Sequence, residues 1–529
     1  MKRPPVGLSL LLSFAFACAG CTEVAAGPAV TATAADSKNP SDVPPAETSQ
    51  APDSRPAAPD TATAHDTATA HDTGPAHDTT TTTTPDDTTT TASNVTIDTT
   101  QRHQTWQFWS TLSRRWDAPH MYYGPGRGPA LDRVPAGDRE AILDALYTRL
   151  GLDAVEVPLV GGDMDPSIEN GGHAWKSHEQ SNDNGDPNSL ESANVNFDYW
   201  PPHLEIVEGA FARIRARGAE PLLGLRVGNV PEWMRQMHGD AQYPEFAEWV
   251  TTLVLYFRDT HGLDVAYVSV NNEPEGNGVD ADTLAKRAKA LETRLNELGL
   301  ETRITAPETV TPGNAVSMGY LAALEANGVA DDLWLVNYHS YDEDASVGLA
   351  PPLADRIALK EFAARHDTAG TFFSEQSTDV KSNTYTFWNN TPEQALAWAN
   401  DVVREMTVTD MAAYCHMWNI WSNNNTATDG FVTLKIGPAP DYAYQGYIEP
   451  IFTGVLGEFM AVIQRGMVRV DATTTAPDVV LVAFVDDARQ TLAVVAVNNG
   501  SAAQELRLPN GVTGFVEAGQ VLALTGSLP

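Results

Sequence analysis

Between about residue 140 and residue 421, apolar residues at helical spacing alternate with short runs of apolar residues. Leu204, Val207 and Phe211, three and four positions apart, predict one face of a helix. Gly218 ends this helix, because glycine is common just after a helix C-terminus. The same spacing predicts helices at 142–150, 246–257 and 284–298. Buried strands are predicted at 152–159, 220–227, 265–270, 302–307, 332–341, 370–376 and 411–421.

This alternation of strands and helices predicts an α/β fold class. Repeated strand–helix units form a parallel sheet that is covered by helices. About eight such units follow one another, which favours a closed (β/α)8 barrel, or TIM barrel, over an open sheet. Functional residues of such a barrel lie at the C-terminal ends of its strands.

The pattern changes after residue 455, where short strands follow one another with short turns. Strands are predicted at 467–471, 479–485, 491–497, 504–508 and 521–525. These strands predict a C-terminal β-sandwich side domain at 456–529, after a barrel domain at 94–455. The isolated strand at 94–98 could join the sandwich.

The first 21 residues predict export. Lys2 and Arg3 precede an apolar stretch at 8–17, which is too short to span a membrane as a helix. The stretch ends in small residues before Cys21, and it resembles the bacterial lipoprotein signal. That resemblance implies a lipid on Cys21 and a cell-surface or outer-membrane lipoprotein; ordinary secretion is the alternative.

Residues 22–93 consist mainly of Ala, Thr, Pro and Asp, so they cannot bury a core and predict a disordered linker. An Ala-His-Asp-Thr repeat at 64–67, 70–73 and 76–79 is expected to be flexible tether, with weak metal binding as the lesser alternative. The net charge of −36 opposes binding to nucleic acid and to anionic lipid head groups. We therefore expect no nucleic-acid partner, membrane contact only through the lipid anchor, and a monomer.

Two glutamates follow predicted strands in the barrel. One lies in Asn272-Glu273-Pro274 and the other in Ser374-Glu375-Gln376. If both face the barrel mouth, they form the carboxylate pair that glycoside hydrolysis requires. The Asn272 amide could bind a sugar 2-hydroxyl group. No organic cofactor and no catalytic metal is expected.

Other strand ends carry residues that could bind a sugar or position a carboxylate. His339 or Tyr341 could orient Glu375, and His339 could instead be a hydrogen-bonded core residue. Trp418 offers a flat apolar face to a pyranose ring. Trp233 and Arg226 could also bind the sugar. For Arg226, the alternative is a buried ion pair.

For three further residues the sequence either leaves two roles open or indicates a structural role. Glu308 could contact a sugar or lie in a loop, and Trp421 could contact a sugar or pack in the core. Cys415 is expected to be a small buried residue, because its neighbours are apolar.

The region 94–529 resembles glycoside hydrolase family 30, one family within the clan of retaining (β/α)8 glycosidases. The resemblance implies hydrolysis of β-linked glycans such as xylan, β-1,6-glucan or β-galactan, with Glu273 as acid/base and Glu375 as nucleophile. It rests on VSVNNEPE (268–275), FFSEQS (372–377), VPEWMR (230–235), NYHSY (337–341) and NVNFDYW (194–200).

Two segments depart from the family pattern. The expected first barrel strand, at 104–109, lacks the family's glycines. Glu156 stands where the family usually has an arginine near the nucleophile; it could oppose ionisation of the nucleophile or pair with Arg226. Glu156 gives some weight to the alternative function, a non-catalytic glycan-binding lipoprotein with a degenerate barrel.

A long polar loop at 161–192 is expected to form a wall of the sugar cleft, because loops of this length are uncommon unless functional. Trp175, in its centre, could stack on a sugar or fix the loop. Its run from Asn182 to Asp186 could bind calcium through oxygen ligands, although a solvated loop is the favoured interpretation.

Overall fold

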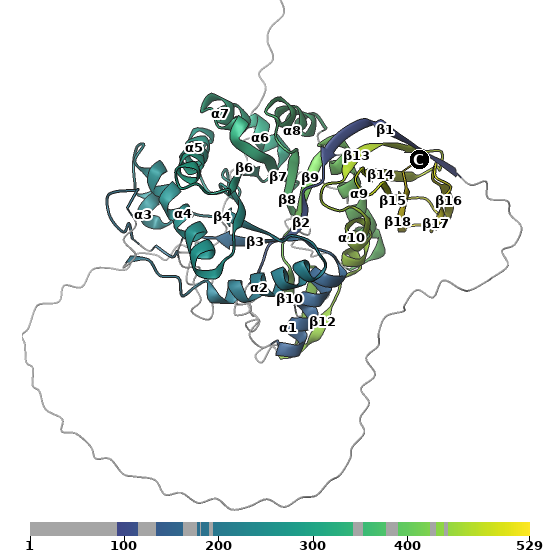
Figure 1. Ribbon diagram of the computed structural model, residues 1–529, viewed down its shortest axis with the longest axis horizontal. Helices are drawn as coiled ribbons and strands as arrows, with labels where there is room; N and C mark the ends of the chain where they lie inside the picture. Colours follow the sequence, from purple (N-terminus) through teal and green to yellow (C-terminus); the bar gives the residue numbers. More distant parts are fainter. Residues whose placement is uncertain are drawn as a thin grey trace, which may run out of the picture. The chain divides into compact units, whose positions relative to one another are not determined.

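Figure 1 shows the computed structural model of the chain. The structure describes residues 93–114, 134–161, 177–179, 181–189, 194–341, 353–376, 390–423, 430–437 and 443–528. The predicted signal, Cys21, Trp175 and nearly all of the predicted linker lie outside these residues. No helix in the described ranges is both long enough and apolar enough to cross a membrane.

Eight parallel strands form the predicted barrel, in the order β2-β9-β8-β7-β6-β5-β4-β3. A parallel bridge between Leu112, just after β2, and Glu156 in β3 brings the two ends of this sheet together. The strands are β2 (Phe108–Thr111), β3 (Ala154–Leu159), β4 (Leu222–Val227), β5 (Val265–Ser269), β6 (Arg303–Thr309), β7 (Leu333–His339), β8 (Thr371–Gln376) and β9 (Met411–His416).

Helices surround the barrel, and three of those predicted from apolar spacing are present as α2, α4 and α5. Gly262 ends α4 with a left-handed backbone (φ 64°), as expected for the residue after a helix. The helices are α1 (Ala136–Leu143), continued by a π-helical turn (Asp144–Arg149), α2 (Pro201–Ala216), α3 (Glu232–Arg235), α4 (Gln242–His261), α5 (Ala281–Glu297), α6 (Pro312–Ser317), α7 (Tyr320–Ala326), α8 (Leu353–Arg365), α9 (Pro392–Val408) and α10 (Ile451–Val462), with a 3-10 turn (Ala330–Asp332) before β7.

The C-terminal residues form the predicted side domain, one sheet in the order β17-β16-β1-β13-β14-β15-β18. Strand β1 (Ser93–Thr105) joins it, and pairs antiparallel with β13 and parallel with β16. A second apolar core, which includes Val95, Leu481 and Val516, lies within this domain. The other strands are β13 (Val468–Thr474), β14 (Val479–Asp486), β15 (Thr491–Asn498), β16 (Gln504–Arg507), β17 (Thr513–Val516) and β18 (Val521–Ser527).

The first barrel strand begins later than the sequence suggested. Gln104 and Thr105 belong to β1, and β2 begins only at Phe108. The backbone N–H of Trp106 donates to Met467 of the side domain, whereas that of Gln107 donates to Ala412 in β9. The chain therefore passes from the side domain into the barrel at this point.

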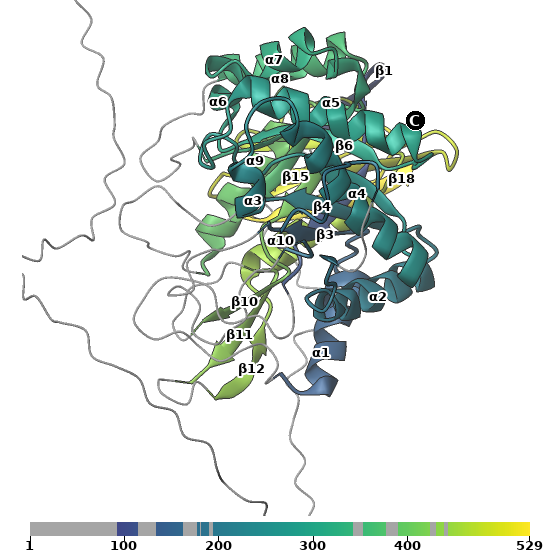
Figure 2. The same ribbon diagram turned by 90° about the vertical axis from the view of Figure 1, so that its left-hand side faces the viewer.

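The strand predicted at 411–421 is broken. Strand β9 ends at His416, and Trp418 has a positive φ of 100°. Strand β10 (Ile420–Asn423) then belongs to a separate sheet with β11 (Val432–Ile436) and β12 (Tyr444–Ile448), which was not predicted. Figure 2 shows this sheet beside α1, where the Tyr444 hydroxyl donates to Asp138 at 2.7 Å.

Aromatic rings fill the barrel below the site. Phe108 lies 5.2 Å from Tyr267 and 5.1 Å from Phe372, measured between ring centroids, and Trp334 joins the same cluster. Phe108, Trp334 and Phe372 are the first or second residues of their strands. The rings therefore form a floor toward the N-terminal ends, under the strand ends where the polar residues gather.

Candidate active site

Glu273 and Glu375 lie next to each other. Glu273 follows β5, and Glu375 is part of β8. One oxygen of each carboxylate and one ring nitrogen of His339 all lie within 4.8 Å of one another. The Glu375 side chain is 6% exposed and that of Glu273 is 32% exposed. The pair is therefore close together and reachable from solvent on the Glu273 side.

The backbone at Glu273 is unusual. Glu273 and Glu308 both have positive φ, 44° and 59°, and the Glu273 N–H donates to the Glu308 carbonyl at 2.9 Å. Residues other than glycine and asparagine rarely adopt this backbone conformation, and those that do are concentrated at functional sites. The two strand ends fix each other and thereby fix the direction of the Glu273 side chain.

Glu375 is held by two donors. Arg226 Nη1 lies 2.5 Å from its Oε2, and the Tyr341 hydroxyl donates to its Oε1 at 2.8 Å. A guanidinium and a hydroxyl on separate oxygens stabilise a carboxylate and fix its plane. Tyr341 therefore lies where the sequence suggested, beside Glu375.

His339 is fully buried among three carboxylates. Its Nδ1 lies 3.2 Å from Glu273 and 3.8 Å from Glu375, and its Nε2 lies 3.6 Å from Glu308. Burial would lower the pKa of His339, but the carboxylates, Glu375 foremost, raise it to about 10. Burial would raise the pKa of Glu273, but the hydrogen bond and charge of His339 outweigh it and hold that pKa below its ordinary value.

Glu156 pairs with Arg226, one of the two outcomes that its position left open. Its Oε2 lies 2.6 Å from Arg226 Nη2, and both side chains are buried. The Tyr267 hydroxyl donates to the other oxygen at 2.7 Å. Burial nevertheless raises the pKa of Glu156. Arg226, from β4, thus brings a guanidinium to Glu375 although the position on β3 carries an acid.

Gly224 leaves the space through which Tyr267 reaches Glu156. A Cβ at Gly224 would lie 2.4 Å from Cζ of Tyr267, well inside van der Waals contact. Glycine in a strand often marks such a close approach. The Cys415 Sγ lies on the same carboxylate, 3.5 Å from Glu156 Oε2, and the cysteine is buried as predicted.

Glu308 has a role that the sequence did not show. It is completely buried, accepts a hydrogen bond from Ser269, and lies 3.1 Å from Arg226 Nε. It lies at the end of β6 and not in a loop, and it forms a further buried carboxylate beside Arg226. Its place at the end of β6 was visible in the sequence, but its inward direction depends on the register of the strands.

The remaining predicted residues differ in how they face the site. Asn272 Oδ1 is shielded from solvent and has no hydrogen-bond partner in the described ranges. The indole of Trp233 donates to the Glu179 carbonyl at 3.2 Å. Trp418 is 4% exposed with Arg114 over its ring at 5.1 Å, so a sugar could stack on it only after Arg114 moved. Trp421 is 3% exposed and packs in the barrel cluster.

No protein-family model and no curated protein matches the sequence. Solved structures do resemble it. An endo-β1,6-glucanase superposes with a TM-score of 0.62 at 14% identity, over 83% of this chain and 94% of the glucanase. The catalytic domain of the family 30 xylanase C from Talaromyces cellulolyticus gives 0.55 at 16% identity, over 82% and 97%. A family 30 endoxylanase from Clostridium papyrosolvens gives 0.53 at 16% identity, over 82% and 100%.

At such low identity the likeness concerns the fold. It includes the two parts described above, the parallel barrel and the β-sheet side domain that takes in an N-terminal strand. The chain therefore has the fold of the family 30 glycoside hydrolases, as the motifs at 268–275 and 372–377 predicted.

Proposed function

We propose that this protein is a retaining glycoside hydrolase of β-linked glycans, with Glu273 as acid/base and Glu375 as nucleophile. The observation that carries the proposal is the approach of their carboxylate oxygens to within 4.8 Å. Double displacement places the two carboxyl groups about 5–5.5 Å apart, whereas inversion needs about 6.5–9.5 Å to admit a water molecule. The short separation favours retention.

In the proposed mechanism Glu375 attacks the anomeric carbon. Its carboxylate forms a glycosyl ester as the glycosidic bond breaks, and the leaving oxygen takes the proton of Glu273. In the second step Glu273 accepts a proton from water, which attacks the ester and releases Glu375. Arg226 and Tyr341 fix the plane of the attacking carboxylate throughout.

Glu273 must carry a proton when the bond breaks, although His339 favours its ionised form in the free protein. Substrate binding supplies a reason for the change. The exposed third of the Glu273 side chain is the part that a sugar would cover, and loss of water raises the pKa of a carboxyl group. Proton uptake by Glu273 is then coupled to substrate binding.

Structures of similar fold and the Asn272 amide support a choice of substrate class. Structures of similar fold include an endo-β1,6-glucanase and xylanases, which makes β-1,6-glucan and xylan the first candidates, with β-galactan next. The unpaired Oδ1 of Asn272 is an acceptor for a sugar 2-hydroxyl group. Export on a lipid anchor at Cys21 would place the enzyme where such polysaccharides are met.

Glu375→Gln tests the proposal. With an activated aryl β-glycoside that the wild type hydrolyses, we expect kcat to fall by about a thousandfold or more, because the amide cannot form the glycosyl ester. Glu361→Gln, an exposed carboxyl group on α8, is the matched control and should keep full activity. NMR of the first product of the wild type should show the β-anomer.

Two other results would replace the proposal. If the wild type binds a β-glycan but releases no sugar from any member of a β-glycan panel, the protein is a glycan-binding lipoprotein. If chelation by EDTA abolishes hydrolysis and a divalent ion restores it, Glu273, His339 and Glu375 bind a metal instead.

A further inference from the structure

A second group of carboxylates lies outside the barrel mouth. Glu179 and Asp183 belong to the predicted loop 161–192, and Glu248 belongs to α4. One oxygen of each side chain lies within 4.8 Å of the other two. The three residues are 1%, 6% and 4% exposed. Three acidic side chains thus converge in a space that is nearly closed to solvent.

Two oxygens of this group lack a hydrogen-bond partner in the described ranges. Oε1 of Glu179 and Oε1 of Glu248 are both buried and accept no hydrogen bond from any residue that the structure describes. A buried carboxylate without a partner is destabilising, because it has lost its hydration without compensation. A bound cation or protons must therefore neutralise these oxygens.

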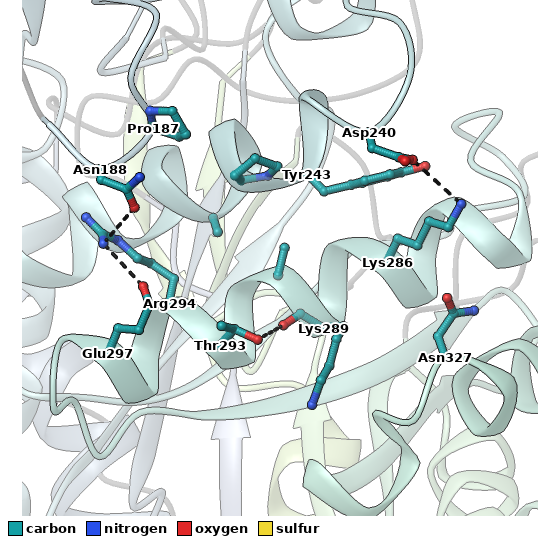
Figure 3. Close-up of a pocket in the computed structure, with 13 residues that line it drawn as sticks. Pro187, Asn188, Asp240, Tyr243, Lys286, Lys289, Thr293, Arg294, Glu297 and Asn327 are labelled. Atoms are coloured by element: carbon teal, nitrogen blue, oxygen red, sulfur yellow. Dashed lines mark hydrogen bonds and ion pairs between the residues drawn. The ribbon is translucent and has the colours of Figure 1, made fainter.

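Nearby side chains do not remove the excess negative charge. Glu245 and Asp186 add to it, because both raise the pKa of Glu248. Arg294 lowers that pKa, but its guanidinium also contacts Asn188 at 3.2 Å and Glu297 at 3.5 Å. Figure 3 shows Arg294 between these two residues, at the edge of a hollow that α4 and α5 line. One shared arginine faces several carboxylates.

The donor atoms indicate the kind of ligand. Carboxylate oxygens without nitrogen or sulfur suit Ca²⁺ or Mg²⁺. Two oxygens bound to Ca²⁺ at about 2.3–2.6 Å can lie up to about 5 Å apart, whereas Mg²⁺ at about 2.1 Å requires about 4.2 Å or less. Separations within 4.8 Å fit a Ca²⁺ ion, whose coordination geometry is more flexible than that of Mg²⁺. The amide Oδ1 of Asn182, also shielded and unpaired, could be a fourth ligand.

We propose that Glu179, Asp183 and Glu248 bind a calcium ion that fastens the segment of residues 177–179 and 181–189 to α4. The segment already contacts this helix, since the Trp249 indole donates to Ser177 at 2.9 Å. The Glu179 carbonyl also accepts the indole N–H of Trp233. The ion would therefore stabilise a segment that positions Trp233, without touching either proposed catalytic glutamate.

Protons are the competing occupants of the cluster. Burial, with the charge of Asp183 next, raises the pKa of Glu179 to about 8 and that of Glu248 to about 7. A carboxyl group must lose its proton before it can bind a cation. The binding experiment is therefore set at pH 8, with the full chain stripped of metal by EDTA and dialysed.

Thermal unfolding with CaCl₂ or MgCl₂ tests the proposal. We expect calcium to raise the Tm by several degrees, and magnesium to raise it less. Glu248→Gln should weaken calcium binding by on the order of tenfold or more, because it removes one charged ligand. The same variant should have a higher Tm than the wild type in EDTA, since it removes a repelling charge. Asp264→Asn, exposed just after α4, should respond like the wild type.

Two outcomes would overturn the proposal: a wild-type Tm that calcium does not change at pH 8, or a Glu248→Gln variant that responds like the wild type. Terbium luminescence excited through tryptophan gives a second measurement, because Trp249 adjoins Glu248. Titration of the wild type with Tb³⁺ should give a signal that calcium competes away, and absence of this signal also overturns the site. None of these measurements depends on glycosidase activity.

Discussion

At the scale of single residues, Arg226 determines the charge balance of the candidate site. Its guanidinium lies within 3.1 Å of Glu156, Glu308 and Glu375, all of them buried. A planar guanidinium can bind several carboxylates at once, whereas a lysine ammonium is a single point charge on a flexible stem. The site therefore depends on arginine itself and not only on positive charge.

Arg226→Lys keeps the positive charge but removes the planar guanidinium, so it tests which of the two the site needs. We expect a folded protein with kcat on aryl β-glycosides reduced by on the order of a hundredfold, because Glu375 loses its fixed plane. The free energy of unfolding should fall by about 3 kcal/mol, since other carboxylates lose their partner. Urea denaturation and steady-state kinetics measure the two effects. Full activity in Arg226→Lys would show that charge alone suffices.

His339 makes stability depend on pH. Its pKa is raised from the ordinary value of 6.5 to about 10 in the folded protein. The folded state therefore holds a proton that the unfolded state has lost above pH 6.5, and this stabilisation declines as the pH rises toward 10. The free energy of unfolding should therefore fall as the pH rises from 6.5 to 9. The measurement is made with calcium in excess, so that the proposed site at Glu248 stays occupied.

His339→Gln is the comparison for this pH dependence. Glutamine does not titrate, so the slope of stability against pH between 6.5 and 9 should be smaller than in the wild type. Urea denaturation at half-unit steps gives both slopes. Parallel curves for the two proteins would mean that other groups cause the dependence.

At the scale of elements, neighbouring strands must pack around the site without steric overlap. Gly224→Ala places a Cβ 2.4 Å from the Tyr267 ring, so β4 or β5 must move. We expect a loss of stability of about 1–3 kcal/mol, as for other overpacked cores, and lower kcat because Tyr267 holds Glu156. Gly137→Ala, in α1 with nothing within 4 Å, is the control and should be neutral or slightly stabilising.

The elements most easily predicted were those whose pattern is local. Strands β3 to β9 follow from apolar runs, and α4 ends at Gly262 because glycine readily adopts its left-handed backbone. The break after β9 was not predictable, because the run to residue 421 stays apolar through Trp418, whose positive φ turns the chain. The sheet β10–β12 depends on that turn.

The candidate site was predicted where its residues end strands. Glu273, Glu375, His339 and Tyr341 were found in this way, and the structure brings them together. The contact of Arg226 with Glu375 joins β4 to β8, and no sequence pattern encodes that distance. The carboxylate group at Glu248 combines a loop with a helix, so it too required the folded structure.

At the scale of the whole described region, barrel and side domain share one core. Trp106 is fully buried against Trp109, with ring centroids 4.3 Å apart, and against Phe484 of β14 at 6.1 Å. Both domains contribute to the same apolar cluster. Neither surface would remain covered if the other domain unfolded, so we expect them to unfold together.

Phe484→Ala tests this cooperation. Loss of its ring should destabilise the protein by about 3–5 kcal/mol and lower both the Tm and the temperature at which hydrolysis stops, although the residue lies outside the barrel. Phe515→Ala, in β17 and 59% exposed, is the matched control and should change neither. Two separate calorimetric transitions, with only the smaller one shifted, would contradict a shared core.

The position of β1 has a mechanical consequence. The strand enters the side domain at Ser93 and lies between β13 and β16 within the sheet. A pull on the N-terminal segment would act along β1, across its ladder of hydrogen bonds, so that many bonds carry the load together instead of opening one by one. The side domain would then resist such a pull before it reached the two proposed catalytic glutamates.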